Sequence, residues 1–163
     1  MSAPSSPPPG TGWVDAIPFR AHVRFLMSVG ALSAADVATV AGVSVTAVDH
    51  LLSARNGDRA RRVSPDTARR LLALSADDVR GLRWHLVPAH RARAKLDTLR
   101  KAGLSDGRIA ERARVDIGDL ARLDGPDQHC SALLSLRLTT AARAHVNRRA
   151  AARAGRRGAS IAA

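Results

Sequence analysis

Four side chains near the start of a candidate helix could bond to a polar partner or touch an apolar group on it. Ser44, Thr46 and His50 offer two hydroxyls and an imidazole, and Val45 offers methyl groups. If residues 45–54 are helical, Ser44 caps the first turn and the other three point outward from its N-terminal part. These groups match the donors, acceptors and methyl groups that base edges present in the major groove of DNA.

The elements around this helix explain how it could be positioned. Apolar residues recur at helical spacing over 34–41 and again over 45–54, with Gly42 between them. Ala38 is small enough to let two helix axes approach, and Gly42 accepts the left-handed backbone of a tight turn. Three apolar residues are expected to anchor the second helix on the core: Val43, Val48 and Leu51. An ordinary helical hairpin whose residues merely pack is the alternative.

This pattern resembles the helix-turn-helix of bacterial and phage repressors. The stretch DVATVAGVSVTAVDHLL, followed by VSPDTARRLLAL, is similar to the headpiece of lactose-repressor-type regulators, in which a third helix closes the core. The resemblance implies that residues 45–54 enter the major groove. The chain departs from that family in an additional helix in front, 20–29, and in the lack of a sugar-binding domain behind. No small-molecule inducer and no cofactor is therefore expected.

The same pattern recurs 72 residues further along the chain, where AGLSDGRIAERARVDIGDLARL aligns with GALSAADVATVAGVSVTAVDHL. The apolar positions are kept, but Arg114 replaces the turn glycine and Gly118 falls within the second helix, which weakens both elements. Asp116 and Asp119 on the outward face would repel phosphate. Contact with DNA and a purely scaffolding role remain open for this copy. The residues expected at DNA in the first case are Arg108, Arg112, Arg114, Ile117 and Arg122.

The charge of the chain favours a polyanionic partner. The sequence holds 26 Lys plus Arg against 14 Asp plus Glu, a formal net charge of +12. Nucleic acid is the expected partner, although an acidic membrane surface would also attract such a chain. All but two of the 26 cations are arginine, which suits bidentate phosphate contacts and equally reflects a GC-rich genome.

Two arginine clusters are placed to contact the DNA backbone. The loop after residue 54 is expected to reach phosphates or an adjacent minor groove, unless its charges are simply solvated. Its cations are Arg55, Arg59, Arg61 and Arg62. The C-terminal tail is expected to contact phosphate through Arg153, Arg156 and Arg157. Asp49, beside His50, is expected to pair with an arginine rather than to accept from a cytosine amino group.

Other site classes find little support in the sequence. Cys130 is the single cysteine, so no intrachain disulfide can form, and with His129 it supplies too few ligands for a metal site. No phosphate-cradling glycine loop, carboxylate pair or nucleophile beside a base is evident, so the chain is not expected to be an enzyme. No stretch approaches the length of a membrane span, and a cytoplasmic location at the nucleoid is expected.

The organisation predicted is all-α, with two tandem helix-turn-helix domains. Expected are a disordered leader (1–15), a first domain (16–82), a degenerate second domain (83–150) and a basic, disordered tail (151–163), in which Gly155 and Gly158 should fray the helix. Trp84 is expected to pack at the junction. Ser64 and Pro65 mark the clearest helix start. The predicted helices are 20–29, 34–41, 45–54, 65–74, 88–102, 106–113, 117–123 and 140–151.

The function predicted is sequence-specific binding of double-stranded DNA by a transcriptional regulator or repressor of bacterial or phage type. An architectural, nucleoid-associated DNA binder is one alternative. The other is an antitoxin-like or phage-type regulator whose second domain binds a protein. Because the two copies differ on their outward faces, an asymmetric site bound by a monomer is favoured over an inverted repeat bound by a homodimer.

Overall fold

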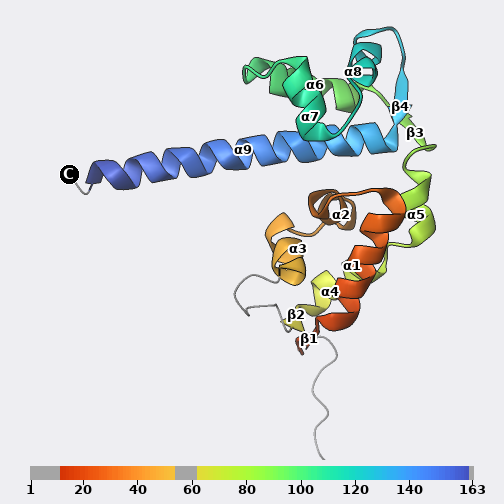
Figure 1. Cartoon of the computed structure of the whole chain (residues 1–163), viewed down its shortest axis with the longest axis vertical. Coiled ribbons are helices and arrows are strands. Elements are labelled where there is room, and N and C mark those ends of the chain that lie inside the picture. The colour runs from red at the N-terminus through yellow and green to blue at the C-terminus, as the bar shows by residue number, and fades with distance from the viewer. Residues whose placement is uncertain (1–11, 54–61, 162–163) are drawn as a thin grey trace, which may run out of the picture. The chain divides into compact units, whose positions relative to one another are not determined.

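The computed structural model describes residues 12–53 and 62–161, with residues 153 and 155–161 described by their backbone alone. Most of the expected leader, residues 1–11, therefore lies outside the described residues. The chain divides into two compact units, unit 1 (Met1–Arg80) and unit 2 (Gly81–Ala163). Helices dominate both units (Figure 1), which confirms the all-α class.

Unit 1 packs four helices around a small apolar core and closes with a two-stranded ribbon. Its elements are β1 (Val14–Asp15), α1 (Ile17–Gly30), α2 (Ala34–Ala41), α3 (Val45–Leu52), β2 (Arg62–Val63) and α4 (Pro65–Leu72), with α5 (Ala76–Gly81) at its end. β1 and β2 are antiparallel, with Val14 opposite Val63 and Asp15 opposite Arg62. Ser64 accepts from the Thr67 N–H and Pro65 begins α4, as the sequence predicted.

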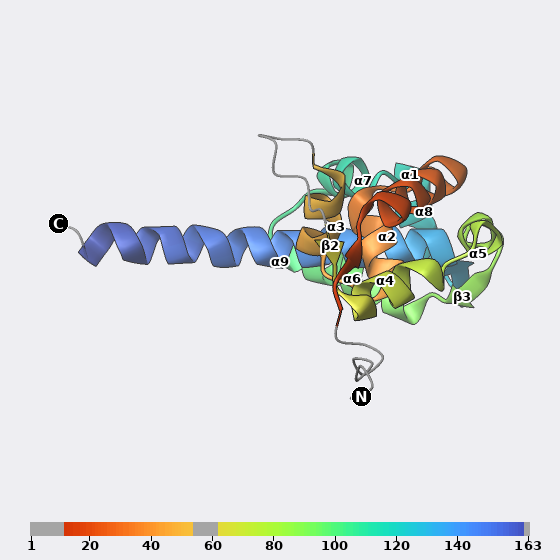
Figure 2. The ribbon, with the colours of Figure 1, turned by 90° about the horizontal axis from the view of Figure 1, so that it is seen from below.

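Unit 2 has the same order of elements. It consists of β3 (Leu86–Pro88), α6 (His90–Lys101), α7 (Asp106–Ala113), α8 (Ile117–Asp124), β4 (His129–Ser131) and α9 (Ala132–Ile161). β3 and β4 are antiparallel, and Val87 lies opposite Cys130. The N-terminal part of α9 packs against α6 and α7, whereas its C-terminal half extends beyond the other helices of the unit (Figures 1 and 2).

The backbone turns of the two units correspond residue for residue. Among the described residues, those with a positive φ are Ala31 and Gly42 in unit 1 and Gly103 and Arg114 in unit 2. Ala31 corresponds to Gly103 and Gly42 to Arg114, at the same 72-residue offset that aligns the two sequence copies. The strained residue of unit 1 is therefore Ala31, at the end of α1, whereas that of unit 2 is Arg114, at the end of α7. The turn geometry is therefore set by the fold and not by glycine alone.

Several elements lie beyond what the sequence predicted. The two ribbons were not expected, because strands of two or three residues are too short to show alternation. α5 was also missed. It is held by Ser75, whose hydroxyl accepts from the Asp78 N–H while the Asp78 carboxylate accepts from the Ser75 N–H. The Ser75 hydroxyl and amide both lower the pKa of Asp78.

The last helix and the second tryptophan also differ from expectation. α9 begins at Ala132 and not at residue 140, because Ser131, the last residue of β4, accepts from the Leu134 N–H at 3.2 Å and starts the helix there. Its backbone stays helical to Ile161, through the glycines expected to fray it. Trp84 is 83% exposed, so its expected packing role is wrong. It lies in a turn before β3, which directs its ring into solvent.

Candidate nucleic-acid interface

The N-terminal part of α3 presents the polar side chains that the sequence singled out. Ser44, Thr46 and His50 are exposed, and Val45 is partly buried. The Ser44 hydroxyl accepts from the Ala47 N–H at 3.1 Å, so its capping role is confirmed. On the opposite side of the helix two apolar residues are fully buried and anchor α3 on the core: Val48 and Leu51.

The turn before α3 is fixed by backbone and side-chain hydrogen bonds. Gly42 has a φ of 67°, which confirms the left-handed turn, and its N–H donates to the carbonyls of Ala38 and Thr39. Arg70 on α4 donates from a terminal nitrogen to the Gly42 carbonyl at 3.2 Å. The helix that follows the ribbon therefore holds the turn from outside.

The far end of α3 is also held. Arg20 on α1 donates from Nε to the Leu51 carbonyl at 2.8 Å. In unit 2, Arg93 on α6 donates to the Leu123 carbonyl at 2.5 Å, the equivalent position of α8. A second pair repeats as well, since Arg137 donates to the Arg114 carbonyl at 2.6 Å as Arg70 does to Gly42. Sequence reasoning missed these positioning arginines, because neither pair follows the 72-residue offset of the copies: Arg20 and Arg93 are about 73 residues apart, and Arg70 and Arg137 about 67.

The loop arginines are described only in part. Arg62 lies on β2 and is exposed. Arg55, Arg59 and Arg61 lie outside the described residues. Asp49 is exposed and forms no ion pair with an arginine of the described ranges, so the expected pairing is not formed there.

The corresponding face of α8 has a different chemistry. Asp116 caps this helix and accepts from the Gly118 N–H at 2.7 Å. Ile117 is 57% exposed, although it is apolar. Arg122 forms an ion pair with Asp119 at 2.5 Å, so part of its charge is balanced within the helix. This face combines acidic groups with an exposed apolar side chain.

α7, the first helix of the second copy, is more basic than α8. Arg108, Arg112 and Arg114 are exposed, and no ion pair joins them to an acid among the residues described. Arg114 has a φ of 56°, so the residue that replaces the turn glycine does adopt the left-handed conformation. The strain anticipated for an arginine in this position is therefore present.

An arginine between two carboxylates ties three helices of unit 2 together. Arg100, near the end of α6, bonds to Asp106 at 2.7 Å and to Asp124 at 2.8 Å. These hydrogen bonds lower the pKa of both carboxyl groups and raise the pKa of Arg100. The cluster joins the start of α7 to the end of α8.

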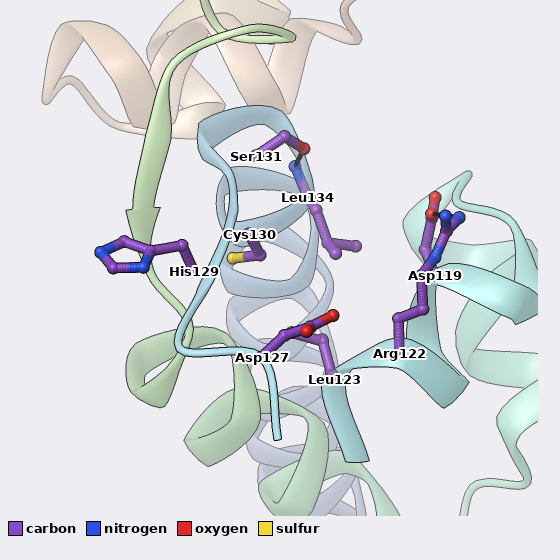
Figure 3. A pocket seen from close by; sticks show the side chains of 8 residues that line it. All are labelled: Asp119, Arg122, Leu123, Asp127, His129, Cys130, Ser131 and Leu134. Carbon is purple, nitrogen blue, oxygen red and sulfur yellow. Dashed lines mark hydrogen bonds and ion pairs between the residues drawn. The ribbon is translucent and has the colours of Figure 1, made fainter. Parts of the chain in front are cut away.

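Each unit contains a small hollow at the same place in its fold. Hollow 1, of about 290 Å³, is lined by Trp13, Ala47, His50, Arg62, Val63, Ser64 and Thr67. Hollow 2, of about 210 Å³, is lined by Asp119, Arg122, Leu123, Asp127, His129, Cys130, Ser131 and Leu134 (Figure 3). In both, the second helix of the turn, the returning strand and the start of the following helix form the walls. Sequence reasoning did not find either hollow, because their walls come from segments separated in the chain.

The charges of the two hollows differ. Hollow 1 has His50 and Arg62 and no acid in its lining among the described residues. Hollow 2 has two acids, Asp119 and Asp127. The ring of His129 is directed to the other side of β4 from Asp119 and Arg122 (Figure 3). Burial raises the pKa of the Cys130 thiol, which keeps it protonated and a poor nucleophile.

The C-terminal half of α9 is a basic helix. From Arg143 onward it contains six arginines and no acid. Arg143, Arg148 and Arg149 are exposed. Arg153, Arg156 and Arg157 lie on the helical backbone, and their side chains are outside the described part of the structure. Burial and the cations Arg149, Arg148 and Arg112 lower the pKa of His145, which marks a region of high positive potential.

Comparison with protein-family models, curated proteins and solved structures found no match. Among the described residues no single helix is long and apolar enough to cross a membrane, although α1 and α2, bent by 105° at their junction, meet that test when taken together.

Proposed function

We propose that this protein is a sequence-specific double-stranded DNA-binding protein, a transcriptional regulator or repressor that reads bases with α3. The observation that carries the proposal is the arrangement of α3 itself. Its apolar side is buried, the turn before it and its own last turn are held by arginines from other helices, and its outward N-terminal part presents Ser44, Thr46 and His50. A rigid helix with hydroxyl and imidazole groups on a free face suits base readout in the major groove.

The backbone contacts of such a protein would come from its arginines. Arg62 lies close to α3, and the basic half of α9 adds charge without acids. Phosphate contacts of this kind raise affinity for all DNA sequences and make binding dependent on salt. In this proposal α3 supplies specificity, and the arginines supply position and affinity.

The test begins with selection of a duplex from a random library by the full chain. Thr46→Ala and His50→Ala should each weaken binding to the selected duplex by about 1 to 3 kcal/mol, while binding to a scrambled duplex at equal salt stays nearly unchanged. Thr98→Ala is the matched control, because Thr98 is an exposed threonine on α6 whose hydroxyl bonds to the Ala94 carbonyl. Equal losses on both duplexes would place Thr46 and His50 outside the base-reading face.

A second candidate function concerns unit 2 alone. Ile117 is exposed beside Asp116 and Asp119 at the end of α8 that would have to enter a groove. Carboxylates are repelled by phosphate, whereas an apolar side chain among acids suits a protein surface with basic groups. We propose that this face binds a protein if it does not contact DNA. Retention of a partner from nuclease-treated lysate that is lost in Ile117→Ser, with DNA affinity unchanged, would support it.

A further inference from the structure

We infer that hollow 1 holds one phosphate of the DNA strand that runs beside α3, with the adjacent deoxyribose against Trp13. The inference rests on the proposed function and names the backbone contact that accompanies base reading. Its basis is the set of side chains that the ribbon and two helices bring to one place.

The ribbon and the residues beside it form one wall of hollow 1. Val14 pairs with Val63 across the strands, and Trp13, Arg62, Val63 and Ser64 line the hollow from this side. Trp13 keeps 63% of its surface exposed, which leaves an indole ring open at the rim.

The groups in the lining suit a phosphodiester. Arg62 can donate two parallel hydrogen bonds to phosphate oxygens, and His50 offers a ring nitrogen. The Ser64 hydroxyl donates to Thr67 Oγ1 at 2.9 Å, which leaves the Thr67 hydroxyl hydrogen for a ligand. Indole rings commonly cover apolar sugar or base surface. His50 also belongs to the exposed side of α3, so a strand held in hollow 1 passes close to the bases that α3 would read.

Hollow 2 provides an internal comparison. The equivalent of Ala47 is Asp119, and the equivalent of Thr67 is Leu134, so hollow 2 gains a carboxylate and has no hydroxyl at the second position. Arg122, in the place of His50, is already paired with Asp119. The same fold position is therefore suited to an anion in unit 1 and unsuited to one in unit 2.

The first experiment tests whether Arg62 contacts one particular phosphate of the duplex. Selected duplexes are prepared with one neutral methylphosphonate at successive positions, and their affinity for the full chain is measured. At one position the substitution should weaken binding of the wild type about tenfold and leave binding of Arg62→Gln unaffected, because the variant no longer binds that phosphate. The salt slope of Arg62→Gln should also be smaller by about one.

The matched control is His129→Gln, the change at the equivalent position of hollow 2. It should retain the wild-type response at every methylphosphonate position. If no position couples to Arg62, or if His129→Gln abolishes the same coupling, the inference is overturned.

A second experiment follows Trp13 directly. The sequence has two tryptophans, so Trp84→Phe leaves Trp13 as the sole tryptophan fluorophore, and the exposed position of Trp84 makes the change harmless to packing. The selected duplex should shield Trp13 from iodide quenching, whereas inorganic phosphate at equal ionic strength should not. Equal shielding by inorganic phosphate would identify a free-anion site and overturn the assignment to DNA.

The outcomes separate the inference from the proposed function. If selected and scrambled duplexes bind equally while Arg62 still couples to one phosphate, sequence-specific reading fails and hollow 1 stands as a phosphate site. If Thr46→Ala weakens only specific binding while Trp13 stays open to iodide in the complex, the proposed function stands and the inference fails.

Discussion

The Nε atom of Arg20 donates a hydrogen bond to the carbonyl oxygen of Leu51 at 2.8 Å, and this bond joins α1 to the last turn of α3. The last carbonyls of a helix have no partner within the helix, so a side chain from elsewhere can satisfy them. Unit 2 repeats the bond between Arg93 and Leu123. Two units with different outward faces thus keep the same means of fixing the second helix of the turn.

Arg20→Met should lower the free energy of unfolding of unit 1 by about 1.5 to 3 kcal/mol, because it removes a charged donor to a partly buried carbonyl. It should also weaken binding to the selected duplex, since α3 becomes less well positioned. Urea unfolding followed by circular dichroism measures the first effect. Arg24→Met, which removes an exposed cation from the same helix, is the control. Equal destabilisation by both variants would show that the bond to Leu51 contributes nothing.

Arg114→Gly should stabilise unit 2 by about 1 kcal/mol, because arginine adopts the left-handed conformation there at a cost that glycine avoids. Arg112→Gly, at a right-handed position in the last turn of α7, should instead destabilise the unit by up to about 1 kcal/mol. The same replacement two residues apart is thus expected to raise the melting temperature at one position and to lower it at the other, as measured by thermal unfolding. A destabilising Arg114→Gly would mean that the side chain of Arg114 makes a contact worth more than the strain.

Acid should weaken unit 2 through the cluster of Arg100, Asp106 and Asp124. Because the pKa of both carboxyl groups is lowered in the folded state, their contribution is fully present above about pH 4, the unfolded value, and is lost as the pH falls through the lowered pKa. Arg100→Met should flatten that dependence by up to about 1 kcal/mol, since the carboxylates are partly exposed.

Urea unfolding at pH 7 and at lower pH measures the effect. Arg80→Met, which removes an exposed pair with Asp77, should leave the acid dependence of unit 2 unchanged. If Arg100→Met has the same acid dependence as the wild type, the cluster does not account for it.

Truncation after Ala150 should reduce salt dependence more than specificity. The deleted end of α9 carries Arg153, Arg156 and Arg157, which would bind phosphate without reading bases. The slope of log affinity against log salt should fall by up to about three, roughly one for each arginine removed from a phosphate. The ratio of selected to scrambled binding at fixed salt should change little. A large fall in that ratio would assign base reading to the tail.

The number of chains on one site follows from the difference between α3 and α8. Thr46 and His50 on one helix correspond to Gly118 and Arg122 on the other, so a monomer using both units should occupy an asymmetric site. Light scattering of the complex should give one chain for each duplex. Two chains on a palindromic duplex would contradict this, and would indicate an inverted repeat read by α3 alone.

The sequence by itself determined most of the helices, with the exception of α5 and the start of α9, and the repeated turn. Apolar spacing defined α2 and α7 at both ends, since helical periodicity and caps are local properties. The 72-residue alignment placed each buried apolar position of the first copy on a buried apolar position of the second. Ser44 and Ser64 were recognised as caps, because the hydrogen bond of a capping serine reaches only a few residues along the chain.

Only the tertiary structure decided how these helices are held and what surrounds α3. The bonds from Arg20 to Leu51 and from Arg70 to Gly42 join residues about 30 positions apart, and the two ribbons are too short to leave a periodic signal. Trp13 lines the same hollow as His50 and Arg62 because β1 pairs with β2. Arrangements of this kind depend on the path of the whole chain, so no local pattern of residue types could have predicted hollow 1 or the exposure of Trp84.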